Sequence, residues 1–175
     1  MLRLATPDDL DAMRSWRNHP QVRSVSLTSH EISASEHAAW WARTQADDSR
    51  QVLVFERSGV PCGVVALTGL GAPDGSATWG FYLDLDGLEE RGETLPAWTS
   101  VGREAVRHAV DELGVRVLRG EVLASNEAVR RMNRLWGFTE SGPRTEDLGD
   151  GPVEVYDIEL RAADRRPRRT GDRRT

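Results

Sequence analysis

Residues Glu121–Phe138 read EVLASNEAVRRMNRLWGF. A run of extended, apolar character ends at Ser125-Asn126, and apolar side chains then recur at helical spacing. Gly137 is a typical helix stop, because glycine adopts the left-handed conformation that ends many helices. The stretch therefore predicts the end of a strand that covers 115–123, a break, and a helix over 126–136. The inward face of that helix is expected to hold Val129, Met132 and Trp136.

The rest of the chain alternates between strand-like and helix-like patterns of apolar residues. Strands are predicted at Leu2–Ala5, Gln51–Glu56, Cys62–Leu67 and Ala77–Leu83, the last three as an antiparallel meander. A Thr6-Pro7 start predicts a helix that ends near Pro20, and a Ser33/Glu36 capping box predicts a second. A third helix is predicted from Leu95 to Gly114, and a closing hairpin from 138–141 and 153–160. The order is β-α-α-β-β-β-α-β-α-β-β, which predicts a mixed α/β sheet flanked by helices.

Composition narrows the class of protein. A length of 175 residues favours one domain, predicted over 1–160, and no apolar run is long enough for a membrane span. No secretory signal opens the chain, so we expect a cytoplasmic protein. The tail 161–175 carries seven Arg and two Asp, a net of +5 that leaves −10 on the other 160 residues. We expect a disordered tail, and the acidic body argues against a nucleic-acid partner.

The order of elements and the strand–Asn–helix–Gly-Phe arrangement resemble the GNAT superfamily of N-acetyltransferases. The resemblance covers residues 1 to about 160 and implies a sheet that splays open between two strands to bind acetyl-CoA. It also implies transfer of an acetyl group to a primary amine. No metal is implied, and a homodimer is left open.

The resemblance implies three binding devices for acetyl-CoA. Backbone amides before the helix at Leu95 are expected to meet the pyrophosphate, at Arg91, Gly92, Glu93 and Thr94. The family pattern here is Gln/Arg-x-x-Gly-x-Gly/Ala, from which Glu89 and Thr94 depart. Backbone groups of the strand that ends near Leu83 are expected to pair with the pantetheine arm, at Phe81, Leu83 and Leu85. Asn126 is expected both to cap the last helix and to reach that arm.

The residues that perform the chemistry are less clear from the sequence. Many family members place a Tyr four residues before the Gly of Gly-Phe, and Asn133 stands there, so an amide replaces the usual general acid. Water, Ser125 or Tyr82 then protonates the thiolate, or no acid is needed. Glu121 is the first candidate for a base, if burial raises its carboxylate pKa; a surface Glu is the alternative. His37 is the second candidate.

A closer resemblance is carried by Trp16-Arg17-Asn18-His19-Pro20 and by Glu36-His37-x-x-Trp40. These motifs resemble the aminosugar N-acetyltransferases of pseudaminic acid synthesis and the ribosomal-protein N-terminal acetyltransferases. Arg17 or Arg23 is then expected to meet a phosphate, and Trp40, Trp41 or Trp79 to line a sugar or base, with core packing as the alternative. The expected acceptor site comprises Trp16, Arg17, Asn18, His37, Trp40 and Trp79.

Three functions remain open at this point. The first is acetylation of a small-molecule amine such as a nucleotide-linked aminosugar. The second is acetylation of protein N-termini, which an acidic body suits because ribosomal proteins are basic. The third is a non-catalytic acyl-CoA binding module, suggested by Asn133 and by the acids of the loop at 89–94.

Overall fold

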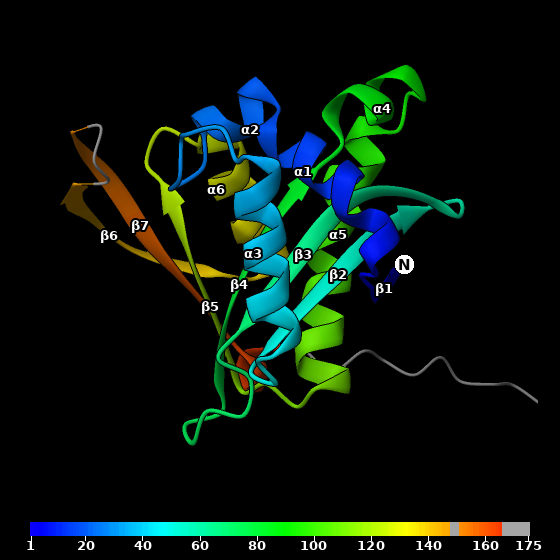
Figure 1. Cartoon of the computed structure of the whole chain (residues 1–175). Helices are drawn as coiled ribbons and strands as arrows, with labels where there is room; N and C mark the ends of the chain where they lie inside the picture. Colours follow the sequence, from blue (N-terminus) through cyan, green and yellow to red (C-terminus); the bar gives the residue numbers. More distant parts are fainter. Residues whose placement is uncertain (148–150, 166–175) are drawn as a thin grey trace, which may run out of the picture.

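A seven-stranded sheet forms the centre of the computed structural model, which describes residues 1–147 and 151–165. The strand order is β1-β2-β3-β4-β5-β7-β6, and every neighbouring pair is antiparallel except β4 and β5 (Figure 1). The predicted mixed, mostly antiparallel sheet is therefore confirmed. The strands are β1 (Leu2–Leu4), β2 (Arg50–Arg57), β3 (Val60–Thr68), β4 (Ser76–Leu83), β5 (Val117–Leu123), β6 (Thr139–Asp147) and β7 (Pro152–Arg161).

Helices cover both faces of this sheet. The face of α1 and α3 is opposite to that of α5 and α6, as Figure 1 shows with α3 in front of the strands and α5 behind them. Among the described residues, no helix combines the length and apolar character that crossing a bilayer requires. The helices are α1 (Leu10–Asn18), α2 (Pro20–Ser24), α3 (Ala34–Gln45), α4 (Leu85–Glu90), α5 (Thr94–Arg107), a π-helical turn (His108–Glu112) and α6 (Glu127–Trp136).

Strand alternation divides the core into two clusters. On β2, Leu53 and Phe55 point to the α5–α6 face, whereas Val52 and Val54 point to the α1–α3 face, because successive strand side chains alternate. On the first face α5 and α6 approach closely at Gly102, where a Cβ atom would lie 2.2 Å from the ring of Trp136. Glycine is needed there because a rigid indole ring cannot move aside.

Two short helices were not predicted. Pro20 ends α1 as expected, but it also starts α2, since proline suits the first turn of a helix. The segment 84–93 was predicted as polar and turn-rich. Instead, the Asp84 side chain accepts a hydrogen bond from the Gly87 amide at 3.1 Å and caps α4. Both helices are shorter than the windows in which periodicity can be detected.

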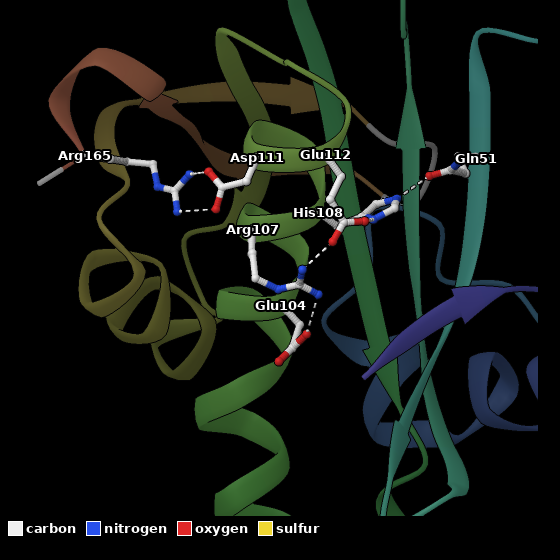
Figure 2. A network of polar contacts seen from close by, with 7 residues as sticks. All are labelled: Gln51, Glu104, Arg107, His108, Asp111, Glu112 and Arg165. Atoms are coloured by element: carbon white, nitrogen blue, oxygen red, sulfur yellow. Dashed lines mark hydrogen bonds and ion pairs between the residues drawn. The ribbon is translucent and has the colours of Figure 1, made fainter. Parts of the chain in front are cut away.

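The carboxyl end of the domain lies beyond the predicted boundary at residue 160. β7 runs through Arg161, a 3-10 helix covers Ala162–Asp164, and Arg165 pairs with Asp111 (Figure 2). In the same network the His108 ring bridges Glu112 and Gln51, and thus joins the end of α5 to β2. The disorder predicted from residue 161 is therefore wrong for 161–165; the remainder, 166–175, lies outside the described residues.

A buried histidine beside the second cluster makes stability depend on pH. His37 is 6% exposed and stacks on Trp40, with ring centroids 5.0 Å apart. Burial lowers the pKa of His37; the positive charge of Arg14 lowers it further, and Asp11 opposes this. An unfolded His titrates near pH 6.5, so just below this pH the unfolded chain binds a proton that folded His37 does not.

We predict that the free energy of unfolding falls as the pH drops through about 6.5 towards the lowered value of His37, and that H37Q weakens this dependence. One proton accounts for a slope of at most about 1.4 kcal/mol per pH unit. Urea titrations from pH 8 to pH 5 measure it. As a control, V52A removes packing from the same cluster and is expected to lower stability equally at every pH. Equal slopes for wild type and H37Q would contradict the prediction.

Candidate active site

The parallel pairing of β4 and β5 ends early. Only Ser76–Thr78 pair with Val117–Arg119, and beyond these residues the two strands separate. A cavity of about 700 Å³ occupies the opening and passes from one face of the sheet to the other. The splayed sheet that the resemblance implied is thus present, between the two strands expected to form it.

Segments on both faces of the sheet line this cavity. Residues Trp79–Leu83 and Leu85 form one wall, and residues from the end of β5 and from α6, with Ile158 of β7, form the opposite wall. Glu89 of α4 and the start of α5, with Thr94 and Trp98, close the α5–α6 side. The end of α1, α2 and the segment after it close the other side. The lining residues of that side are Arg17, Gln21, Val22, Val25, Ser26, Leu27 and Thr28.

The start of α5 differs in detail from the predicted amide loop. The amides of Arg91, Gly92 and Glu93 donate to carbonyls of the α4 turn, at 2.8–3.3 Å, and so are already used. None of these three residues lines the cavity. Arg91 lies near Asp84 and Glu93 at 3.9 and 3.6 Å, so its charge is matched within the protein.

Thr94 does line the cavity, as predicted. Thr94 and Leu95 occupy the first turn of α5, and within the described part of the chain their amides have no hydrogen-bond partner. Pro96 has no amide hydrogen. The usable donors are therefore shifted into the helix itself, where the positive end of its dipole favours an anion.

Two asparagines of α6 border the cavity. Asn126 caps the helix, accepting a hydrogen bond from the Val129 amide at 3.2 Å, and is 9% exposed. Asn133 is 1% exposed, and neither Nδ2 nor Oδ1 has a partner among the described residues. A buried amide without partners costs free energy, so this one fits a ligand with both a donor and an acceptor, as the amides of a pantetheine arm have.

Glu121 reaches the cavity but is not buried. Its side chain is 40% exposed and forms an ion pair with Arg144, which also contacts Glu146 and Asp157 at 2.8 and 2.7 Å. Of the two alternatives left open by the sequence, burial and surface exposure, the structure shows the exposed one: among the described residues no helix covers this part of β5 on the α1–α3 face.

The two candidate acids are not equivalent. Ser125 is exposed and does not line the cavity. Tyr82 does line it, on the α1–α3 side, and burial raises its pKa far above the usual range, although the charge of Arg17 opposes this. Tyr82 therefore keeps its proton and can donate a hydrogen bond, but it is a poor source of a proton.

The predicted acceptor site is only partly assembled. Arg17 lines the cavity; its Nη2 donates to the Thr28 carbonyl at 2.8 Å, and its buried Nη1 has no partner among the described residues. Trp79 also lines the cavity, but its ring packs between Phe81 and Phe138 at 5.4 and 5.3 Å.

The other four predicted acceptor residues lie elsewhere. Trp16 and Trp40 pack against the cluster of Met13 and Val54, and His37 stacks on Trp40 in the same region. Asn18 makes hydrogen bonds to the backbone of Ile32. These side chains support the α1–α3 layer, because the apolar face of α3 is turned towards the sheet and away from the cavity.

Sequence reasoning missed the segment Val25–Thr28, Gln21 and Trp98, all of which line the cavity. Trp98 lies within the helix predicted from Leu95, and its ring meets that of Phe81 edge-on, with centroids 5.7 Å apart. The segment after α2 has no periodic pattern, so only its place next to Arg17 reveals its role.

Comparisons with known proteins agree with this geometry. Residues 1–139 match the acetyltransferase (GNAT) domain family. No curated protein sequence matched the chain.

Solved structures share the fold at low identity. A spermidine N-acetyltransferase from Vibrio cholerae, crystallised with CoA and spermine, has a TM-score of 0.79 at 17% identity, over 93% of this chain and 95% of that chain. A ribosomal-protein-alanine N-acetyltransferase from Brucella melitensis gives 0.68 at 20%, over 92% and 99%. The N-acetyltransferase PseH from Campylobacter jejuni gives 0.67 at 16%, over 93% and 97%. The splayed sheet, the cavity across it and the matched domain lead to one conclusion: the chain belongs to the GNAT family of acetyl-CoA-dependent N-acetyltransferases.

Proposed function

We propose that this N-acetyltransferase acts on the primary amine of a small molecule that also carries an anionic group, such as a nucleotide-linked aminosugar. The observation that carries the proposal is the cavity across the sheet, which joins the free amides of α5 on one face to Arg17 on the other. A cavity with two ends lets a donor and an acceptor meet in the gap between β4 and β5, with the amine attacking directly.

The α5–α6 end fits acetyl-CoA. The amides of Thr94 and Leu95 would hold its pyrophosphate, and β4 beyond Thr78 has no strand partner on the side of the gap, so its backbone would pair with the pantetheine arm. Asn133 and Asn126 would meet the amides of that arm. When bound, the cofactor supplies an acetyl group as a thioester, whose leaving thiol is acidic enough that a general acid is not obligatory.

On the acceptor side we assign two roles. Glu121 accepts the proton of the amine; its partial exposure lets that proton pass on to solvent. Tyr82 keeps its proton and donates a hydrogen bond within the gap, while Ser125 and Arg91 take no part because neither lines the cavity.

Arg17 favours an acceptor with a negative group. Its Nη1 is buried without a partner in the described part of the chain, and no carboxylate lies within ion-pair distance of it there. A buried guanidinium without a counter-ion is costly, and an anionic acceptor would supply that counter-ion. A polyamine would bring a second cation to the same place.

A second candidate is the N-terminus of a basic protein. The excess of ten negative charges on residues 1–160 supports it, because such a surface attracts a basic partner. A non-catalytic acyl-CoA binding module is the third, and the absence of turnover with every amine would favour it.

The first prediction concerns Asn133. In the free protein the Asn133 amide is buried without a hydrogen-bond partner among the described residues, which costs free energy. We therefore expect N133L to be as stable as wild type or more stable, and to bind acetyl-CoA about ten-fold more weakly. Urea unfolding and calorimetry measure the two quantities. T44V is the matched control: the Thr44 hydroxyl is also buried without a partner among the described residues, but it lies outside the cavity. Unchanged affinity in N133L would contradict the assignment.

The second prediction concerns Glu121. E121Q should lower kcat/KM about a hundred-fold near neutral pH, since a positioned base contributes on that order. E146Q is the control, because Glu146 shares Arg144 with Glu121 but does not line the cavity. An equal loss in both variants would assign the effect to Arg144, and no loss in either would remove Glu121 from the mechanism.

The third prediction tests the acceptor. Free thiol is followed with acetyl-CoA and UDP-glucosamine, glucosamine, spermidine or a basic peptide with a free N-terminus. We expect UDP-glucosamine to be the fastest, and R17Q to raise its KM about ten-fold while glucosamine changes little. R14Q, on the same helix but outside the cavity, is the control. Preference for the peptide would favour the second candidate; release at the blank rate with every amine would favour the third.

A further inference from the structure

The segment Val25–Ile32 connects α2 to α3 without helix or strand. Its first four residues, Val25–Thr28, line the same cavity as Arg17. Figure 1 shows this part of the chain between α2 and α3, in the upper part of the view. A segment without regular structure can form a fixed wall only if its backbone groups are held by other residues.

Side chains from α1 and α2 hold this segment. Arg17 donates to the Thr28 carbonyl and Arg23 to the Ser29 carbonyl, both at 2.8 Å. The Ser26 hydroxyl donates back to the Val22 carbonyl at 2.6 Å. The Ser26 amide also donates to the Arg23 carbonyl at 3.2 Å, and Arg23 lies 3.8 Å from Glu31. The segment is thus attached at several points, one of them through Arg17, whose other nitrogen, Nη1, is buried without a partner among the described residues.

Asn18 holds the far end with two hydrogen bonds. Its Nδ2 donates to the Ile32 carbonyl and its Oδ1 accepts from the Ile32 amide, each at 2.8 Å, across 14 residues of sequence. The side-chain amide therefore pairs with both backbone groups of one residue, as a neighbouring strand would. Asn offers a donor and an acceptor at this reach; Asp lacks the donor, and Gln is longer by one methylene.

We propose that Asn18 is a positioning residue for the acceptor: its pair of hydrogen bonds to Ile32 fixes the segment that forms the acceptor-side wall of the cavity. Asn18 does not itself line the cavity, so any effect on the reaction passes through the segment. The inference rests on the proposed function for the identity of the acceptor side. Because Arg17 is attached to the same segment at Thr28, loss of the Ile32 contact also loosens the guanidinium.

The test combines hydrogen exchange with kinetics on the full chain. In N18A the Ile32 amide loses its acceptor, so we expect hydrogen exchange in the segment Val25–Ile32 to rise about ten-fold, while the strands of the sheet keep their protection. Calorimetry should give an affinity for acetyl-CoA within about two-fold of wild type. The KM for UDP-glucosamine should rise about ten-fold, with kcat changed by less than about three-fold.

Two variants sharpen the result. N18D keeps the acceptor but sets a carboxylate oxygen against the Ile32 carbonyl, so it should behave like N18A. S24A is the matched control, because Ser24 also donates to a backbone carbonyl, that of Gln21 at 2.9 Å, without holding the segment. S24A should match wild type in exchange and in KM.

Three outcomes would overturn the inference: unchanged hydrogen exchange in Val25–Ile32 of N18A, a uniform rise in exchange over the whole sheet, or faster exchange in the segment with an unchanged KM. If wild type acetylates none of the amines, the proposed function fails, and the acceptor role of Asn18 fails with it. The exchange data alone then decide whether Asn18 holds the segment, so the two failures remain distinguishable.

Discussion

The early end of the β4–β5 ladder is the constraint on which the rest of the site depends. Three residue pairs join β4 and β5, whereas the pairings of β2 with β3, β3 with β4 and β5 with β7 each join more residues. At Gly120 the strands are still close, since a Cβ there would lie 3.2 Å from the Trp79 carbonyl. Beyond it, the rings of Trp79, Phe81 and Trp136 pack together on the α5–α6 face, with centroids 5.4–5.8 Å apart. Rings of this size stabilise the separation, because closing the gap would require them to leave the core.

The cavity has one end on each face of the sheet. Free amides of α5, the unpaired side of β4 and the amide of Asn133 border one end of the cavity. Arg17, Tyr82 and Glu121 border the other end. Among the charged groups near the cavity, Arg91 and Glu121 form ion pairs with neighbours, whereas Arg17 donates to a backbone carbonyl and has no carboxylate within ion-pair distance among the described residues. A ligand that carries negative charge would complete the acceptor end in the way that a carboxylate completes the other ion pairs.

How far the sequence allowed prediction differs between elements. The strands β2 to β5 and helix α6 were predicted from their apolar residues, because burial leaves a pattern in the sequence: a continuous apolar run in β2 and β3, which bury both faces, and helical spacing in α6. Thr94 and Asn126 were expected at the cavity because of the family resemblance; local geometry alone indicates only that each lies at a helix start, where free amides and caps occur. For Glu121 the sequence left burial and surface exposure open, because whether a helix covers that part of β5 depends on residues far along the chain; the side chain is 40% exposed. The Trp-Arg-Asn motif predicted three acceptor residues, of which Arg17 alone lines the cavity.

The sequence by itself determined the order of the strands and of the longer helices, the break at Ser125-Asn126 and hence the resemblance to the family, since these depend on contacts between near neighbours and on single residue preferences. Only the tertiary structure decided which side of each element faces the cavity. Trp16, Arg17 and Asn18 are consecutive. Trp16 nevertheless packs on the core, Arg17 lines the cavity and Asn18 forms hydrogen bonds with Ile32. Helical geometry turns successive side chains by about 100°, and what each then meets is set by packing between segments distant in the sequence.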